Sequence, residues 1–331
     1  AIVLGAPPAV AYVAPMKLPV DVDEMGVAGG LVGAPINMGW AKTVDLLVPA
    51  EAEIVIEGYI DTEYLEPEGP FGESHGHIAL EEFNMPMRVT AITHRVDAVV
   101  ASYISQVTPS ESSAIKLVSY EPMFLSHLKK TLGIRGVKRV KLHERLTALR
   151  RIIIVVVEKN TPQSEIWRAL QGAAAFRADC GKICIAVDED IDPENADAVF
   201  WALAFRMNPS SDLQVINYRS PGHGPEREHE AERVDATLLM DATRKEELPP
   251  LALPKREFME RAGQIWDELG LPKRRPQSPW FSPGEGDWLP QWDAAALRAV
   301  QGRYAENGEI SKQQKRSGMK PETRYRPDLK S

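Results

Sequence analysis

The sequence predicts an α+β fold in three consecutive parts: a β-rich first part, an α/β layered second part, and a C-terminal helix with a polar tail. Strand patterns dominate the start, helix and strand patterns alternate from Ser113, and strand patterns cease after Thr243. A chain of 331 residues is long for one domain. We therefore expect domains at 1–112, 113–250 and 251–331.

Four segments of the first part have the composition typical of strands. They are Asp45–Leu47, Glu53–Tyr59, Met87–His94 and Val99–Ser105. Residues 95–98 would join the last two in a hairpin. The glycine-rich stretch 26–34 does not match the G-x-G-x-x-G fingerprint of dinucleotide-binding folds. It indicates either glycines beside a ligand or a tightly packed turn.

Alternating elements predict the layered second part. Two helices come first, Ser113–Tyr120 and Pro122–Leu132, because Pro suits the first turn of a helix and Gly133 a helix end. The β-branched run Arg151–Glu158 is typical of a strand buried on both faces. The next elements are a helix at Pro162–Ala178, a strand at Lys182–Val187, a helix capped by Asp192 and ending near Arg206, and a strand at Leu213–Asn217. An amphipathic helix at Pro254–Leu269 precedes a tail that we expect to be disordered from about Gly308.

Composition excludes several classes of protein. The net charge is −8 with both signs mixed along the chain, so no basic face for nucleic acid is expected. No apolar run approaches the length of about 20 residues that spans a bilayer, and we expect a cytoplasmic protein. The two cysteines, Cys180 and Cys184, are too few for a disulfide framework and are expected to be buried free thiols.

The segment Glu68-Gly69-Pro70-Phe71-Gly72-Glu73-Ser74 places two carboxylates on either side of a turn. Gly69 and Gly72 allow unusual φ values and Pro70 fixes one, so Glu68 and Glu73 can converge. Converging carboxylates tend to have separated pKa values, which suits proton transfer. A solvated surface turn is the alternative.

Five motifs stand in one order along the chain. They are Val48-Pro49-Ala50-x-x-Glu53-Ile54-Val55-Ile56-Glu57-Gly58, Pro67-Glu68-Gly69-Pro70-Phe71-Gly72-Glu73, Thr90-Ala91-Ile92-Thr93-His94-Arg95, Trp201-Ala202-x-x-x-Arg206-Met207-Asn208-Pro209 and Asp241-Ala242-Thr243. The set resembles the UbiD family of reversible decarboxylases, from about residue 1 to about residue 271. The resemblance implies a split β-barrel flavin-binding domain, truncated at its start, followed by an α/β domain that mediates homo-oligomer formation.

The implied activity is a lyase reaction: reversible non-oxidative decarboxylation of an aromatic, heteroaromatic or α,β-unsaturated carboxylic acid. The implied cofactors are prenylated FMN, a divalent metal, usually manganese, and potassium. By position, Glu68 resembles the family carboxylate that pairs with an arginine near the flavin. Glu73 resembles the acid that delivers a proton once carbon dioxide has left. This chemistry requires an electron sink and a nearby proton donor.

The resemblance also implies residues for the cofactors. Glu24 aligns with the glutamate that bridges metal and potassium near the flavin phosphate, where hard cations take oxygen ligands. Val13, Ala14 and Met16 align with potassium ligands, mostly through backbone carbonyls. Some relatives carry a phosphate-facing lysine where this chain has Thr237, and Arg233 is the candidate replacement.

The family's catalytic arginine, and its asparagine and histidine metal ligands, lie upstream of the residues matched here. The resemblance therefore implies the C-terminal portion of a longer decarboxylase and leaves the activity of this chain alone open. Two alternatives remain: a non-catalytic fragment or assembly subunit, and a redox flavoprotein on a similar barrel. The implied partners are further copies in a dimer or a hexamer of dimers, and a flavin prenyltransferase that supplies the cofactor.

Three histidines lie near these motifs. His75 and His77 would share one face of a strand, which permits a metal pair but favours a substrate-pocket or plain strand role. His223, in a glycine-rich loop, is expected to neighbour the pocket.

Overall fold

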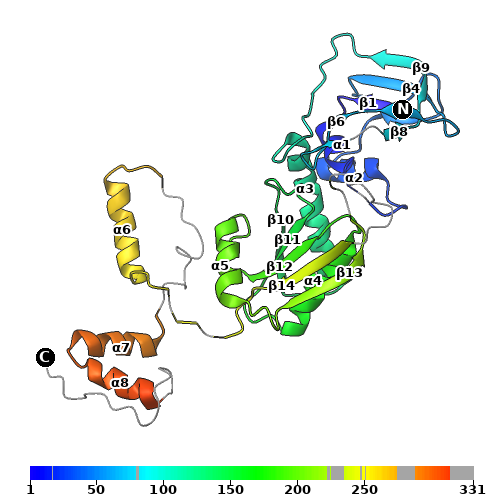
Figure 1. Cartoon of the computed structure of the whole chain (residues 1–331). Coiled ribbons are helices and arrows are strands. Elements are labelled where there is room, and N and C mark those ends of the chain that lie inside the picture. The colour runs from blue at the N-terminus through cyan, green and yellow to red at the C-terminus, as the bar shows by residue number, and fades with distance from the viewer. Residues whose placement is uncertain are drawn as a thin grey trace. The chain divides into compact units, whose positions relative to one another are not determined.

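The computed structural model describes residues 1–16, 18–79, 82–221, 224, 235–246, 248–249, 251–273 and 288–313. It is a mixed α/β structure (Figure 1). The chain forms two compact units, 1–245 and 246–331. The three domains predicted from the sequence stay predictions.

The first part of the larger unit is built from small antiparallel sheets (Figure 1). Its main sheet has the order β1 (Ile2–Leu4), β4 (Ile54–Ile60), β9 (Met87–His94). The remaining pairs are β2 (Met38–Trp40) with β3 (Leu47–Pro49), β5 (Glu66–Glu68) with β8 (Glu82–Asn84), and β6 (Phe71–Gly72) with β7 (Ile78–Ala79). These strands form no closed barrel among the described residues, so the split barrel stays a prediction.

A buried carboxylate ties the β2–β3 connection to β4. The side chain of Glu57 is 1 % exposed and accepts hydrogen bonds from the backbone N–H groups of Lys42 and Thr43 at 2.6 to 2.9 Å. The Thr43 hydroxyl donates to it at 2.8 Å. The backbone N–H of Lys42, followed by those of the other donors, lowers the pKa of Glu57 against the opposing effect of burial. Glu57 thus has a structural role.

Two expectations for the first part are wrong. Residues 99–105 form no strand, because Glu53 accepts the backbone N–H of Val99 at 3.0 Å and holds the chain in a loop rather than a ladder. Of the two interpretations of the glycine-rich stretch, the tightly packed turn is wrong, because the stretch lies largely within helix α2 (Glu24–Val32). Asp23 caps this helix through the N–H groups of Met25 and Gly26, and Gly33 ends it in the left-handed conformation at φ 81°.

The second part is a five-stranded sheet with helices on both faces (Figure 1). Its order is β10 (Val137–Leu142), β11 (Ile152–Val157), β12 (Ile183–Asp188), β14 (Asp235–Asp241) and β13 (Leu213–Arg219). The three central strands are parallel and the two edge strands antiparallel. One face packs on α3 (Glu111–Ser126) and α4 (Gln163–Phe176), the other on α5 (Ala196–Arg206). The β-branched strand β11 contributes side chains to the hydrophobic cores on both faces of the sheet, as expected of a central strand.

Three element predictions for this part need correction. Pro122 lies inside α3 instead of starting a helix, and the helix continues into the π-turn His127–Thr131. Burial of Tyr120, Phe124 and Leu128 along one face offsets the cost of the proline, about 3 kcal/mol. Asn195 rather than Asp192 caps α5. The central strand β14 was not predicted.

The smaller unit contains helices α6 (Arg256–Glu268), α7 (Pro290–Val300) and α8 (Tyr304–Gln313). The amphipathic helix expected at 254–269 is confirmed as α6. The expected disorder from Gly308 is wrong as far as Gln313, since these residues belong to α8, and residues 314–331 lie outside the described residues. In the described ranges, no helix is both long enough and apolar enough to cross a membrane.

Candidate active site

Glu73 lies in the tight turn between β6 and β7. Its N–H donates to the carbonyl of His77 at 3.0 Å, and its carbonyl accepts the N–H of Gly76 at 2.9 Å. Gly76 has φ +85°, which favours glycine. The N–H of Ser74 donates to Glu73 Oε2 at 2.7 Å. The partly buried carboxylate therefore has a defined orientation.

The Glu73 turn packs against the chain that leads into α3. A Cβ at Gly72 would lie 3.0 Å from the side chain of Gln106, and one at Gly76 would lie 3.3 Å from Val107. Ser112 in α3 in turn donates to Ser105 at 2.9 Å. These close approaches place the turn beside the start of α3.

His75, two residues after Glu73, is half-buried in the same turn. Partial burial lowers its pKa, against the opposing charge of Glu73, and the positive charges of His77 and Arg151 lower it further. The rings of His75 and His77 are 5.6 Å apart. Within the described residues, neither belongs to a group of three or more His, Cys, Asp or Glu side chains that could hold a metal.

Glu68 has a different environment. It is the last residue of β5 and is exposed, and the side-chain amide of Asn84 on β8 donates to its Oε2. Gly69 adopts φ +99°, as its position in the motif predicted, whereas Gly72 is an ordinary strand residue. Glu68 and Glu73 thus bond to separate partners, and their convergence stays a prediction.

The residues proposed for metal and potassium lie around the small core of α1 (Pro8–Val13) and α2. The side chain of Val13 is fully buried there and Met16 packs against it, while Ala14 is exposed. The Val13 carbonyl already accepts the N–H of Met16 at 2.8 Å. Glu24 begins α2 with an exposed carboxylate.

These donors suit a hard cation in type but not in number. Carboxylate and carbonyl oxygens are what Mn²⁺, Mg²⁺ and K⁺ take, and a divalent ion needs more side-chain ligands than Glu24 alone. In the described part of the chain no cluster of three metal-binding side chains occurs. The described residues therefore supply some of the ligands that a metal site needs but do not form a complete site. Arg233 and His223 lie outside the described residues.

Sequence reasoning missed three cationic side chains around the Glu73 turn. Lys116 on α3 is partly buried, and its pKa is lowered by burial and by Arg150 but raised by Glu73. Arg150 donates to Asp179 at 2.7 Å, and Arg151 contributes to the field at His75. The available signal was a lysine inside the helical apolar run Ala114-Ile115-Lys116-Leu117-Val118.

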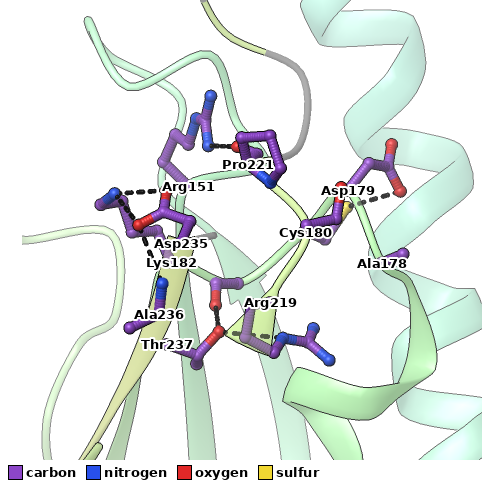
Figure 2. A pocket seen from close by; sticks show the side chains of 12 residues that line it. Arg151, Ala178, Asp179, Cys180, Lys182, Arg219, Pro221, Asp235, Ala236 and Thr237 are labelled. Carbon is purple, nitrogen blue, oxygen red and sulfur yellow. Dashed lines mark hydrogen bonds and ion pairs between the residues drawn. The ribbon is translucent and has the colours of Figure 1, made fainter. Parts of the chain in front are cut away.

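A small hollow opens at the amino ends of the parallel strands (Figure 2). Lys182 pairs with Asp235 at 2.6 Å, and Arg151 donates to the carbonyl of Pro221 at 2.6 Å. Thr237, the position of the family's phosphate-facing lysine, is buried and donates to the carbonyl of Gly181 at 2.8 Å.

Arg219 completes the hollow and has a structural role. Its Nε donates to the Thr237 hydroxyl at 3.2 Å, and its Nη2 donates to carbonyls at the end of α4, those of Ala174 and Arg177. Binding the last carbonyls of a helix satisfies groups that would otherwise lack partners. The side chains that line the hollow are thus engaged with one another and with neighbouring backbone.

The opposite end of the sheet is filled by ion pairs. The Trp201–Pro209 motif and the Asp241-Ala242-Thr243 motif meet there, at the carboxyl ends of β12 and β14. Asp241 is fully buried and accepts from the N–H and hydroxyl of Thr243 at 2.9 and 2.6 Å. Open α/β sheets usually bind ligands at this end. Here its polar groups hold the motifs together, whereas Arg151, at the amino end, acts electrostatically on His75 of the Glu73 turn.

Two family models match this chain. Residues 1–107 match the 3-octaprenyl-4-hydroxybenzoate carboxy-lyase Rift-related domain, and residues 117–230 match the C-terminal domain of the same enzymes. An uncharacterized protein of Aquifex aeolicus is 30% identical over 284 residues, which cover 82% of this chain and 56% of the relative. An uncharacterized protein of Archaeoglobus fulgidus is 27% identical over 286 residues, which cover 81% of this chain and 56% of that relative.

Solved structures with the same fold are also similar to this chain. The UbiD-class enzyme HmfF from Pelotomaculum thermopropionicum, in an evolved dimeric form in complex with prFMN, is 26% identical with a TM-score of 0.63, over 76% of this chain and 54% of that one. Vanillic acid decarboxylase of Sedimentibacter hydroxybenzoicus, in open form, has the same fold, with a TM-score of 0.64 and 23% identity. The match covers 81% of this chain and 58% of that one.

The chain thus spans little more than half the length of the relatives it matches. Both family domains occur in the order that the sequence motifs predicted, and the charge of Arg151 in the second acts on His75 in the Glu73 turn of the first. This chain belongs to the UbiD family of carboxy-lyases.

Proposed function

We propose that the protein catalyses reversible, non-oxidative decarboxylation of an aromatic, heteroaromatic or α,β-unsaturated carboxylic acid with prenylated FMN. The observation that carries the proposal is the Glu73 turn. It holds a partly buried carboxylate in a fixed orientation, against α3 and beside the cationic side chains of Lys116 and Arg151. A structure neighbour in complex with prFMN supports the choice of cofactor.

Glu73 is the proposed proton donor. When carbon dioxide leaves, the carbon that carried it must take up a proton, and a carboxylic acid held at a fixed position can supply one. Prenylated FMN, when bound, supplies the electron sink that makes the departure possible. In the reverse direction Glu73 would take up the proton. The two backbone hydrogen bonds that close the turn would keep the carboxyl group in place during both steps.

Glu68 and Glu24 have supporting roles in this proposal. Glu68 would orient a cationic partner beside the flavin, and its bond to Asn84 fixes the side chain at the end of β5. Glu24 would ligate the divalent metal, with carbonyls of Val13, Ala14 and Met16 directed at potassium. Homo-oligomer formation by the second part, cofactor supply by a flavin prenyltransferase and a cytoplasmic location also stay proposals.

The test is Glu73→Gln in protein reconstituted with prenylated FMN, manganese and potassium. The amide keeps the shape but cannot donate the proton, so we expect release of carbon dioxide to fall at least about a hundredfold, while flavin absorbance is unchanged. Glu66→Gln, on the exposed side of the same hairpin region, is the matched control and should keep its activity. Near-normal turnover of Glu73→Gln would remove Glu73 from the mechanism. No release from any of the three acid classes, despite bound flavin, would favour the non-catalytic alternative.

A further inference from the structure

Lys116 lies on the inward face of α3. Ser113 and Tyr120, three residues before it and four after it, share that face and are buried. Ser113 donates to the side chain of Glu144, and the guanidinium of Arg150 lies 5.7 Å from the ring of Tyr120. The face therefore packs on residues 144–150, and Lys116 points toward them.

The ammonium group of Lys116 has no hydrogen-bond or ion-pair partner in the described part of the chain. Lysine is rarely placed on an inward face without one, because removing its charge from water costs free energy. Two charged groups act on it: Arg150 repels it, and Glu73 attracts it without forming an ion pair. Arg150 is itself bonded to Asp179. Among the described residues, the charge of Lys116 thus lacks a bonded counter-ion beside Glu73, and an anion bound there would supply one.

The reacting carboxylate is a poor candidate for that anion. Its charge leaves it when neutral carbon dioxide departs, so a cation paired with it would stabilise the substrate more than the transition state. An anionic group elsewhere on the substrate keeps its charge throughout the reaction. Binding such a group would position the reacting carbon beside Glu73 without raising the barrier.

We infer that Lys116, with Arg150 beside it, binds a second anionic group of the substrate, one that stays on the molecule when carbon dioxide leaves. The substrate class is then an unsaturated or aromatic acid with another carboxylate or a comparably charged substituent. That class rests on the proposed function, whereas anion binding by Lys116 can be tested separately.

The test compares aromatic dicarboxylates with the monocarboxylates that lack the second group, using holoenzyme reconstituted with prenylated FMN. We expect wild type to prefer the dicarboxylate. Lys116→Met should lose about ten- to a hundredfold in kcat/KM on the dicarboxylate alone, mainly through KM. Lys116→Arg should retain most of the preference. Lys130→Met, an exposed lysine of the helical continuation of α3, is the matched control and should behave as wild type.

Two results would overturn the inference: an equal effect of Lys116→Met on both kinds of acid, or loss of flavin from this variant, which would assign Lys116 to the cofactor. Calorimetric binding of the same acids separates this inference from the proposed function. Lys116-dependent binding of dicarboxylates without any turnover would support the inference and contradict the decarboxylase proposal. Turnover of monocarboxylates with no Lys116-dependent binding would support the decarboxylase proposal and contradict the inference.

Discussion

Arg206 and Asp190 form a two-pronged ion pair at the carboxyl end of the central sheet, with Nη1 to Oδ1 at 2.9 Å and Nη2 to Oδ2 at 2.6 Å. The Arg206 side chain is fully buried; it also donates to Asp188 at 3.1 Å and lies 5.0 Å from the ring of Trp201. The Trp201–Pro209 motif thus contributes to a structural cluster rather than to the proposed active site.

We expect Arg206→Met to lower the free energy of unfolding by about 3 kcal/mol, because it leaves the buried carboxylate of Asp188 and the half-buried one of Asp190 without their main cation. Urea unfolding followed by fluorescence would measure this. Arg261→Met removes an exposed arginine of α6 and should change stability by less than about 0.5 kcal/mol. An equally small loss for Arg206→Met would show that the cluster does not stabilise the fold.

Glu57 should make stability depend on pH. Its pKa is lowered in the folded protein, so its contribution is complete above the pKa of the unfolded chain, near 4.5, and is lost as the pH falls through the lower folded value. Glu57→Gln should therefore destabilise the protein at neutral pH, and the gap from wild type should narrow on acidification.

Urea midpoints at about pH 7 and about pH 4 would check this prediction, with the exposed Glu63→Gln as control. A gap that stays constant between the two pH values would contradict it, since the effect would then come from packing rather than from the charge of Glu57.

Cys180 and Cys184 should be unreactive in the folded protein. Burial raises the pKa of each thiol to about 12, so almost no thiolate forms at about pH 8. A disulfide-exchange reagent should modify neither cysteine until denaturant is added, and both afterwards. Rapid modification of either thiol in native protein would contradict the buried placement.

Glu24→Ala should reduce the retention of metal and flavin with little effect on folding, because its carboxylate is an exposed oxygen donor at the start of α2. Metal analysis and flavin absorbance of reconstituted protein measure the loss. The neighbouring exposed Asp21→Ala is the control. Full occupancy of both cofactors in Glu24→Ala would refute the proposed ligand role.

Local pattern was enough for the elements whose own residues fix their state. The β-branched run at 151–158 became the central strand β11, the alternating segment at 87–94 became β9, and the amphipathic pattern at 254–269 became α6. Local pattern failed where packing overrides it. Pro122 lies within a helix because the buried face continues past it, and β14 is a strand because β12 and β13 flank it.

By itself, the sequence determined the family, through motifs in a specific order, and placed both carboxylates of the Glu68–Glu73 segment beside glycines. Only the tertiary structure decided which side chains surround Glu73. Lys116 and Arg151 come from α3 and from the residue before β11, far from Glu73 in the chain. No local pattern encodes that proximity, because it arises from the packing of the turn on Gln106 and Val107.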